Sequence, residues 1–221
     1  MLFSDNVTTT IYIPERHAEH DPRLIASFME TYSFAMVITA HGGAGGVQIS
    51  NVPTLLENSD TLLWHLALPN PQNEALRAGA ETTVVFHGPH SYISPNWYET
   101  AHAVPTWNFA AVHCTGTPRR IDDDAELEAS LARLVERNES RYAAGATRWQ
   151  LAQMPPQYLA GLRRAIAGYT MRIDRVEAKF KLGQERQAAD RAGVLRALQE
   201  DKGREKSLAE LTAEYYARLG R

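Results

Sequence analysis

The chain has 221 residues and a mass of 24.7 kDa, which is enough for one large domain with a sizeable core. With 44% hydrophobic and 22% charged residues, its composition is that of a globular protein and excludes disordered, collagen-like and coiled-coil chains. No run approaches the roughly eighteen apolar residues of a membrane-spanning helix, and the first residues lack the basic-then-apolar pattern of a secretion signal. The one cysteine, Cys114, allows neither an internal disulfide nor a cysteine-based zinc site, so we expect a soluble cytoplasmic protein.

The net charge of −3 conceals an uneven distribution along the chain. Residues 1–118 hold three basic residues against ten acidic ones, whereas residues 163–221 hold fourteen against nine. A nucleic-acid-binding face normally carries a stronger basic surplus, so DNA binding has little support from charge. A phosphate-bearing ligand held by the N-terminal part would need cations from elsewhere in the chain or from a second copy.

In the first half of the chain, the pattern predicts mostly antiparallel β-structure. Asp21 followed by Pro22 is typical of a helix start, and Gly79 is a stop for a short helix over 73–78. We predict a hairpin rather than a phosphate loop at the glycine-rich residues 41–46, because another strand and not a helix follows them. Strands are expected over 33–40, 46–56, 61–68, 82–87 and 107–117. Their close spacing excludes crossover helices and favours a barrel.

The second half is predicted to be mainly helical. The acidic run at Asp122 begins a helix, and Pro155–Pro156 opens another with Ile166 on its apolar face and Gly168 at its end. Residues 169–178 can return to the sheet, and Ser207 with Glu210 forms a capping box for a helical tail. We therefore expect a single domain over 1–221, with a barrel core at about 12–180, a helical insertion at about 122–168 and a helical extension at about 187–221.

Aromatic residues are concentrated between residues 86 and 109, where six of the chain's 19 aromatic side chains occur. Pro89, Pro95 and Pro105 interrupt this segment, which predicts a stiff loop rather than a helix. Such a loop can form the wall of a site for a flat ligand, because rings supply stacking area at low entropic cost. The other interpretation is that these side chains cover a barrel end or a dimer interface.

Two long motifs in this segment carry a resemblance to a known family. GPHSYISPNWY (88–98) and VPTWNFAAVH (104–113), with YIPERHAEHDP (12–22) and KFKLGQERQAADRAGV (179–194), resemble the PaiB family of FMN-binding negative transcriptional regulators. The resemblance extends over about residues 12–198. It implies a mainly β (α+β) fold, a six-stranded antiparallel FMN-binding split barrel with peripheral helices like that of pyridoxamine phosphate oxidases, and a homodimer with FMN at the subunit interface.

The resemblance and the residue types together predict the cofactor site. Thr106 and Asn108 can donate to and accept from the polar edge of a flavin, and Trp107 can stack on it or shield it. The full predicted set comprises His65, Asn70, Gln72, Ser91, Tyr92, Ser94, Trp97, Thr106, Trp107, Asn108, Lys179, Lys181, Gln184 and Arg186. Leu68 stands where the family has an arginine and Glu185 where it has an asparagine, so Lys179, Lys181 and Arg186 are the candidate phosphate ligands.

The sequence offers little support for a metal site or for hydrolytic catalysis. The pairs His17/His20 and His87/His90 lack a third ligand, so no metal site is expected. Cys114 is predicted to be an inert buried thiol. No hydrolase, nucleotide-triphosphate or zinc-protease motif occurs, so no catalytic residue is assigned, and any enzymatic activity would be that of an FMN-dependent oxidoreductase. The alternatives are a DNA-binding or protein-interaction repressor that has lost the cofactor site, and a haem-binding split barrel.

Overall fold

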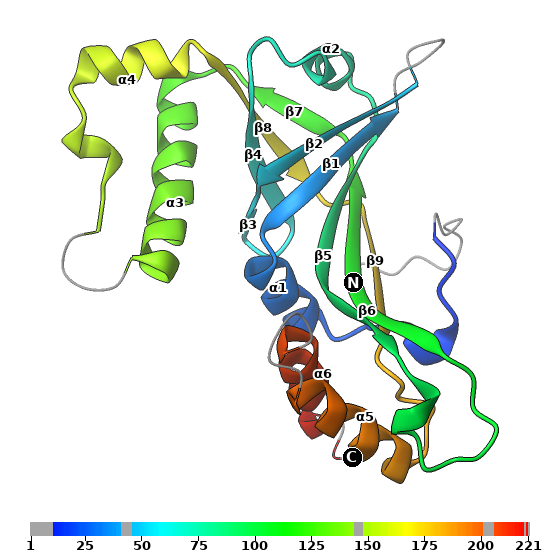
Figure 1. Cartoon of the computed structure of the whole chain (residues 1–221). Helices are drawn as coiled ribbons and strands as arrows, with labels where there is room; N and C mark the ends of the chain where they lie inside the picture. The colour runs from blue at the N-terminus through cyan, green and yellow to red at the C-terminus, as the bar shows by residue number, and fades with distance from the viewer. Residues whose placement is uncertain (1–10, 41–45, 144–147, 201–205, 219, 221) are drawn as a thin grey trace. The chain divides into compact units, whose positions relative to one another are not determined.

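The computed structural model describes residues 11–40, 46–143, 148–200, 206–218 and 220. These residues form six α-helices (Figure 1): α1 (Pro22–Thr31), α2 (Gln72–Arg77), α3 (Asp124–Tyr142), α4 (Pro156–Arg163), α5 (Ala188–Glu200) and α6 (Lys206–Arg218). Short 3₁₀ helices occur at η1 (Glu15–His17), η3 (Pro95–Trp97) and η4 (Leu151–Gln153). No helix in the described part of the chain is both long and apolar enough to cross a membrane.

The strands form two antiparallel sheets, which confirms the α+β class. A five-stranded sheet has the order β2 (Val47–Pro53), β1 (Phe34–Ala40), β5 (Thr82–Ile93), β6 (Thr106–Gly116), β9 (Arg175–Lys181). A four-stranded sheet has the order β3 (Leu55–Glu57), β4 (Thr61–Ala67), β8 (Ile166–Arg172), β7 (Pro118–Ile121). β1 and β2 pair from Ala40–Val47 to Phe34–Pro53, as expected for a hairpin, although its turn at 41–45 lies outside the described residues.

The described residues hold nine strands, whereas six were expected. Two of the expected strands divide into two each, with one part in each sheet, and β7 at Pro118–Ile121 was not expected. The expected strand 46–56 divides at Thr54, whose backbone N–H donates to Ser33 O at 2.8 Å. The expected strand 169–178 divides where the Ile173 and Asp174 N–H groups donate to Asp60 O and Thr115 O. Since a hydrophobic pattern reports burial but not the partner of each strand, it could not show these switches.

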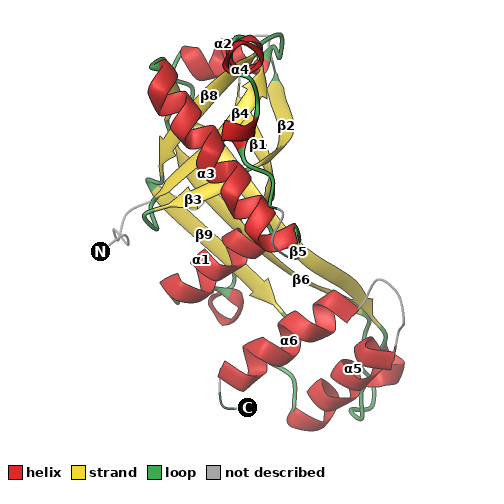
Figure 2. Cartoon of the chain, turned by 90° about the vertical axis from the view of Figure 1, so that its left-hand side faces the viewer, coloured by secondary structure: helices red, strands yellow, loops and turns green. Residues whose placement is uncertain are grey.

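The chain forms two compact units. Unit 1 contains residues 26–86 and 113–176, with the whole four-stranded sheet, and unit 2 contains the described residues of 11–25, 87–112 and 177–220. In unit 1, α3 lies across one face of the four-stranded sheet (Figure 2). There Leu127 packs with Leu63 and Ile121 in a buried cluster. In unit 2, α5 and α6 pack against each other (Figure 2).

Three predictions of secondary structure were wrong in their limits. α4 ends at Arg163, and Ile166 begins β8 instead of continuing the helix. Gly168 lies within β8, where it pairs with His65 of β4 instead of ending a helix. A Cβ at this position would lie 2.5 Å from Leu127 Cδ1 of α3, which explains why the residue is glycine. α6 begins at Lys206, so Ser207 lies inside the helix and not at the N-cap of a capping box.

The aromatic segment is also not the single loop that was expected, because β5 continues to Ile93 and β6 begins at Thr106. The pairing of β1 with β5 covers only Thr82–Val85. Pro89 lies beyond that pairing, so its missing N–H costs no hydrogen bond to β1. The segment is therefore two strands joined by residues 94–105.

Candidate functional site: an aromatic platform on unit 2

The end of β5 and the start of β6 present aromatic side chains outward from the sheet. Along each strand successive side chains alternate between the two faces. Ser91 and Asn108 are buried, whereas Tyr92 and Trp107 are 46% and 49% exposed. Half-exposed aromatic side chains such as these offer ring surface to a flat ligand. The predicted aromatic residues are thus available to a ligand, but from strands rather than from a loop.

These side chains form one cluster that includes a histidine. The Trp107 indole Nε1 donates to His90 Nδ1 at 3.2 Å, and the two ring centroids lie 5.8 Å apart. The Tyr92 ring meets Trp107 edge-on, with centroids 6.3 Å apart. We call His90, Tyr92 and Trp107 the aromatic platform. The hydrogen bond fixes the orientation of the indole and leaves its exposed part free for stacking.

A lysine from β9 is attached to the same strand. Lys181 Nζ donates to Trp107 O at 2.7 Å and also to Thr106 Oγ1. Burial lowers the pKa of Lys181, and the nearby carboxylate of Glu185 opposes that shift. Lys181 is thus a partly desolvated cation at the start of β6, where an anionic or electron-rich ligand group would gain more than in open water.

Lys179 makes different contacts from Lys181. Its Nζ donates to Tyr12 O at 2.8 Å and lies 5.3 Å and 5.5 Å from the ring centroids of Tyr12 and Phe109. These contacts hold the segment that precedes η1 against β6 and β9. Both predicted lysines on β9 therefore contact β6, Lys179 at the ring of Phe109 and Lys181 at the carbonyl of Trp107.

Other predicted residues of unit 2 support the backbone. Ser94 caps η3 by accepting from Asn96 N, and the Ser91 hydroxyl donates to Tyr92 O at 3.0 Å. Gln184 bridges Leu182 N and Phe180 O within the turn after β9. The carbonyl of Trp97 lies so close to α5 that a Cβ at Gly193 would approach its oxygen to 2.1 Å. These residues position the strands that carry the platform.

Asn108 and Arg186 lie at a small internal cavity that also touches Tyr98, Asp190 and Tyr216. Arg186 stacks on the Tyr98 ring at 4.6 Å, and Asn108 Oδ1 is buried without a hydrogen-bond partner. The cavity volume is about 10 Å³, the space of about one water molecule. It therefore cannot hold an organic ligand, and a water molecule is the group that would satisfy Asn108 there.

Asp190 of α5 fixes the loop that follows η3. Its carboxylate accepts from Glu99 N and Thr100 N at 2.9 Å each and from Thr100 Oγ1 at 2.6 Å. These hydrogen bonds, led by that of the Thr100 hydroxyl, hold the pKa of Asp190 below its ordinary value against the opposing effect of burial. The ionised carboxylate is therefore the form that keeps this loop in place.

The pH dependence of stability tests the role of Asp190. A carboxyl group with a lowered folded-state pKa stabilises the fold above about pH 4, and this contribution is lost as the pH falls through the lowered value. We expect Asp190→Asn to lower the urea midpoint at pH 7 and to flatten its decline below about pH 4. Urea titrations of both proteins between about pH 3 and 7 measure this. If the urea midpoints of the two proteins fall in parallel as the pH is lowered, the ionisation of Asp190 does not contribute to stability.

The predicted residues of unit 1 have structural partners there. Asn70 accepts from Gln72 N and donates to Ser50 Oγ, so it holds the start of α2 against β2. Gln72 is fully buried, and its Nε2 lies within hydrogen-bond distance of Val37 O and Thr39 Oγ1 at 3.0 Å each. Asn70 and Gln72 thus connect α2 to β1 and β2.

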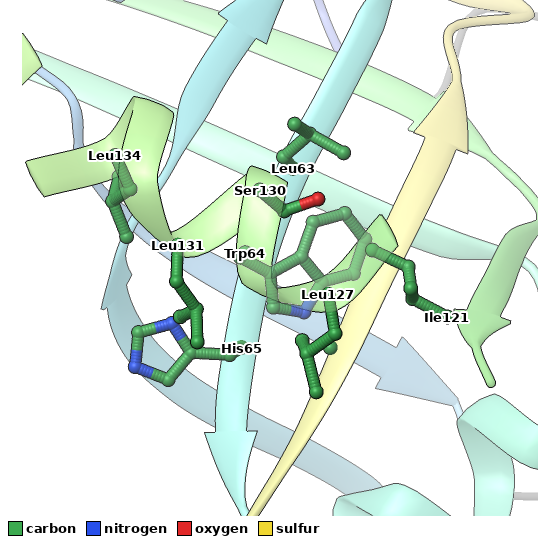
Figure 3. A pocket seen from close by; sticks show the side chains of 9 residues that line it. Leu63, Trp64, His65, Ile121, Leu127, Ser130, Leu131 and Leu134 are labelled. Carbon is green, nitrogen blue, oxygen red and sulfur yellow. The ribbon is translucent and has the colours of Figure 1, made fainter. Parts of the chain in front are cut away.

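His65 lines an apolar pocket between β4 and α3 (Figure 3), with Leu131 and Leu134 beside it. Burial lowers the pKa of His65, and no charged group opposes that shift. A neutral imidazole in leucine-lined surroundings is typical of a core position. The pocket encloses only about 10 Å³, so it has no room for a flavin edge or a phosphate.

Sequence reasoning missed His90 and Asp190. His90 was considered only as one half of a metal-binding pair, yet its partner is Trp107, 17 positions along the chain. In the described ranges, no group of three or more His, Cys, Asp or Glu side chains is arranged to hold a metal ion. Alternation along an expected strand over 87–93 would have placed His90 and Tyr92 on one face.

Comparison with known proteins identifies the family. Residues 11–175 match the model of the family described as "Putative FMN-binding domain". The chain belongs to this family. It is also 30% identical over 205 residues to "Protease synthase and sporulation protein PAI 2" of Bacillus subtilis, covering 91% of this chain and 96% of that protein. The resemblance to the PaiB family is thereby confirmed, and the family match includes the platform but ends before Lys181.

Solved structures share the fold at lower identity. The FAD and haem binding protein from Mycobacterium smegmatis superposes with a TM-score of 0.57 at 19% identity, over 80% of this chain and 79% of that one. A flavocytochrome from Azotobacter vinelandii gives a TM-score of 0.53, also at 19% identity, over 79% and 74% of the two chains. At these identities, the similarity establishes the fold alone.

Proposed function

We propose that this protein binds FMN and that the aromatic platform takes the flavin ring. The observation that carries the proposal is the half-exposed Trp107, which is fixed by His90, flanked by Tyr92 and joined through its backbone to Lys181. A planar three-ring ligand stacks on such a surface, and the lysine suits the electron-rich edge of the ring system or the phosphate. The family match supports this choice of ligand.

The residues present fit a flavin better than a metal or a reactive covalent intermediate. FMN, when bound, supplies hydride and electron transfer, so the chain itself needs no nucleophile or general base. Trp107 and Tyr92 would bind and orient the ring, and Lys181 would place a positive charge beside it. On this basis, we propose a flavin-dependent oxidoreductase as the activity, with the split-barrel architecture and the homodimeric state of the family.

A titration of the full chain with FMN tests this function. We expect saturable quenching of flavin fluorescence, weakened about tenfold by Lys181→Gln because one charged donor is lost. The control is Arg172→Gln, which removes a 79% exposed cation of unit 1 and should leave the FMN affinity unchanged. A wild-type protein that leaves flavin fluorescence unaltered would refute the proposal. A parallel haemin titration with a saturable Soret shift and no FMN binding would favour haem.

A regulatory role is the second candidate, and a relative favours it. The Bacillus subtilis protein is named "Protease synthase and sporulation protein PAI 2", and the family resemblance implies negative control of transcription. For this chain, we propose flavin-linked repression, in which the flavin state changes DNA affinity. Gel retardation at several salt concentrations, with oxidised and reduced FMN, measures it. DNA affinity that falls steeply with salt and differs between flavin states supports repression, whereas no retardation at low salt contradicts it.

A further inference from the structure

Unit 1 contains a second cavity, which the flavin proposal does not use. Its volume is about 340 Å³, within the range of small-molecule sites. Three arginines line it, Arg120 from β7 and Arg163 and Arg164 from the end of α4. Its apolar wall consists of Leu68, Ile121, Leu127, Ala160 and Ile166. A cavity that combines three guanidinium groups with an aliphatic wall suits a small organic anion.

The arginines are only partly satisfied by acidic side chains. Arg163 pairs with Glu128 through Nη1, yet its Nε is buried without a hydrogen-bond partner. Arg120 Nε lies 3.2 Å from Asp122 Oδ1 but likewise makes no hydrogen bond. Both Nε atoms are buried, so the parts of Arg120 and Arg163 that remain for a ligand are their terminal nitrogens.

Arg164 is the cation with unused binding capacity. Its side chain has no acidic partner within the described parts of the chain, whereas Arg120 and Arg163 each face one carboxylate. Asp122 and Asp124 also line the cavity, so its charge is mixed and not purely basic. The first turn of the 19-residue helix α3 adds the positive end of a helix dipole beside Asp124.

We propose that this cavity binds a phosphoryl group carried by a small organic molecule. A phosphate dianion offers several acceptor oxygens to guanidinium forks, and it would engage Arg164, which no carboxylate neutralises within the described parts of the chain, together with the exposed parts of Arg120 and Arg163. A carboxylate has fewer acceptor sites and one charge, so it would satisfy fewer of these donors. The aliphatic wall then contacts the organic part of the ligand. This site is independent of the proposed flavin platform.

Isothermal titration of the full chain with inorganic phosphate and with phenyl phosphate tests the proposal. We expect saturable binding of both, weakened about tenfold or more by Arg164→Gln. Asp124→Asn removes a competing carboxylate and should strengthen binding several-fold, while the N-cap residue Asp123 keeps α3 in place. Arg172→Gln serves as the matched control, because its side chain is exposed and does not line the cavity.

The pattern of the variants decides the outcome. Opposite effects of Arg164→Gln and Asp124→Asn, with no effect of Arg172→Gln, would establish the site. Absence of phosphate binding by the wild type, or equal weakening by Arg164→Gln and Arg172→Gln, would overturn it. Titrating Arg164→Gln with FMN tests the independence of the two sites. Unchanged FMN affinity is expected, and a loss of FMN affinity would overturn a phosphoryl cavity that is separate from the aromatic platform.

Discussion

Trp107→Ala is expected to weaken FMN binding by about 2 kcal/mol, which corresponds to about thirtyfold in Kd. The substitution removes the half-exposed indole and, with it, the hydrogen bond that orients His90. It leaves the strand intact, because the backbone carbonyl of Trp107 still accepts from Lys181. Flavin fluorescence titrations of the two proteins at equal temperature and salt provide the measurement.

Trp149→Ala is the control for this effect. Trp149 is also a partly exposed tryptophan, but it lies in unit 1, after α3. Its removal should change the FMN affinity by less than about twofold. Equal losses for Trp107→Ala and Trp149→Ala would mean that the platform is not the flavin site. Trp107→Phe retains a smaller stacking surface without the indole N–H and should recover part of the affinity.

Gly193→Ala is expected to produce the largest loss of stability, about 3 kcal/mol. A Cβ at this position would lie 2.1 Å from the Trp97 carbonyl oxygen and 3.3 Å from its carbon. Because these are backbone atoms, no side-chain rotation can relieve the clash. α5 and η3 must separate, which also disturbs the hydrogen bonds of Asp190 to Glu99 and Thr100. Urea unfolding of the full chain measures the difference.

Gly161→Ala gives the matched comparison. Gly161 lies within α4, and a Cβ there would meet nothing within 4 Å. Alanine favours the helix over glycine, so this variant should be more stable by about 0.5–1 kcal/mol. If Gly193→Ala unfolds at the same urea concentration as the wild type, then α5 does not approach η3 as closely as the structure has it.

The sequence predicted well those features that depend on neighbouring residues. Asp21 with Pro22 marked the start of α1, and Asp123 caps α3 as the acidic run indicated. Gly79, with a φ of 76°, ends the turn after α2 as expected. Each of these depends on the local backbone and a cap, and both can be recognised within a few residues.

The features that depend on distant contacts could not be predicted. Gly168 resembled a helix stop, but its smallness serves the close approach of Leu127 from another element. Asp190 is joined to Glu99 and Thr100 across about ninety positions, and no periodicity reports such a contact. The phosphoryl cavity is likewise assembled from separate segments, which bring Arg120 together with Arg163 and Arg164.

Some of the predicted cofactor residues lie together in the structure, whereas others are hydrogen-bonded to backbone groups elsewhere. Thr106, Trp107 and Lys181 meet on neighbouring strands of unit 2, because β6 and β9 pair in the sheet. Asn70 and Gln72 satisfy backbone groups of β1 and β2 instead, and a motif alone cannot show which polar atoms are already used. The aromatic residues indicated a flat ligand from the sequence alone. Burial and hydrogen bonding, which the sequence does not show, decide which side chains are free to contact such a ligand.

FMN binding on the aromatic platform can be observed through the indole N–H signals of the four tryptophans in a ¹⁵N–¹H correlation spectrum recorded during an FMN titration. The Trp107 signal, assigned by its absence in Trp107→Phe, should move or broaden saturably as FMN is added. The Trp64 signal, from a buried indole of unit 1, and that of Trp149 should stay in place. FMN binding that leaves the Trp107 signal unmoved, or that shifts only Trp64 or Trp149, would contradict a flavin site on the aromatic platform.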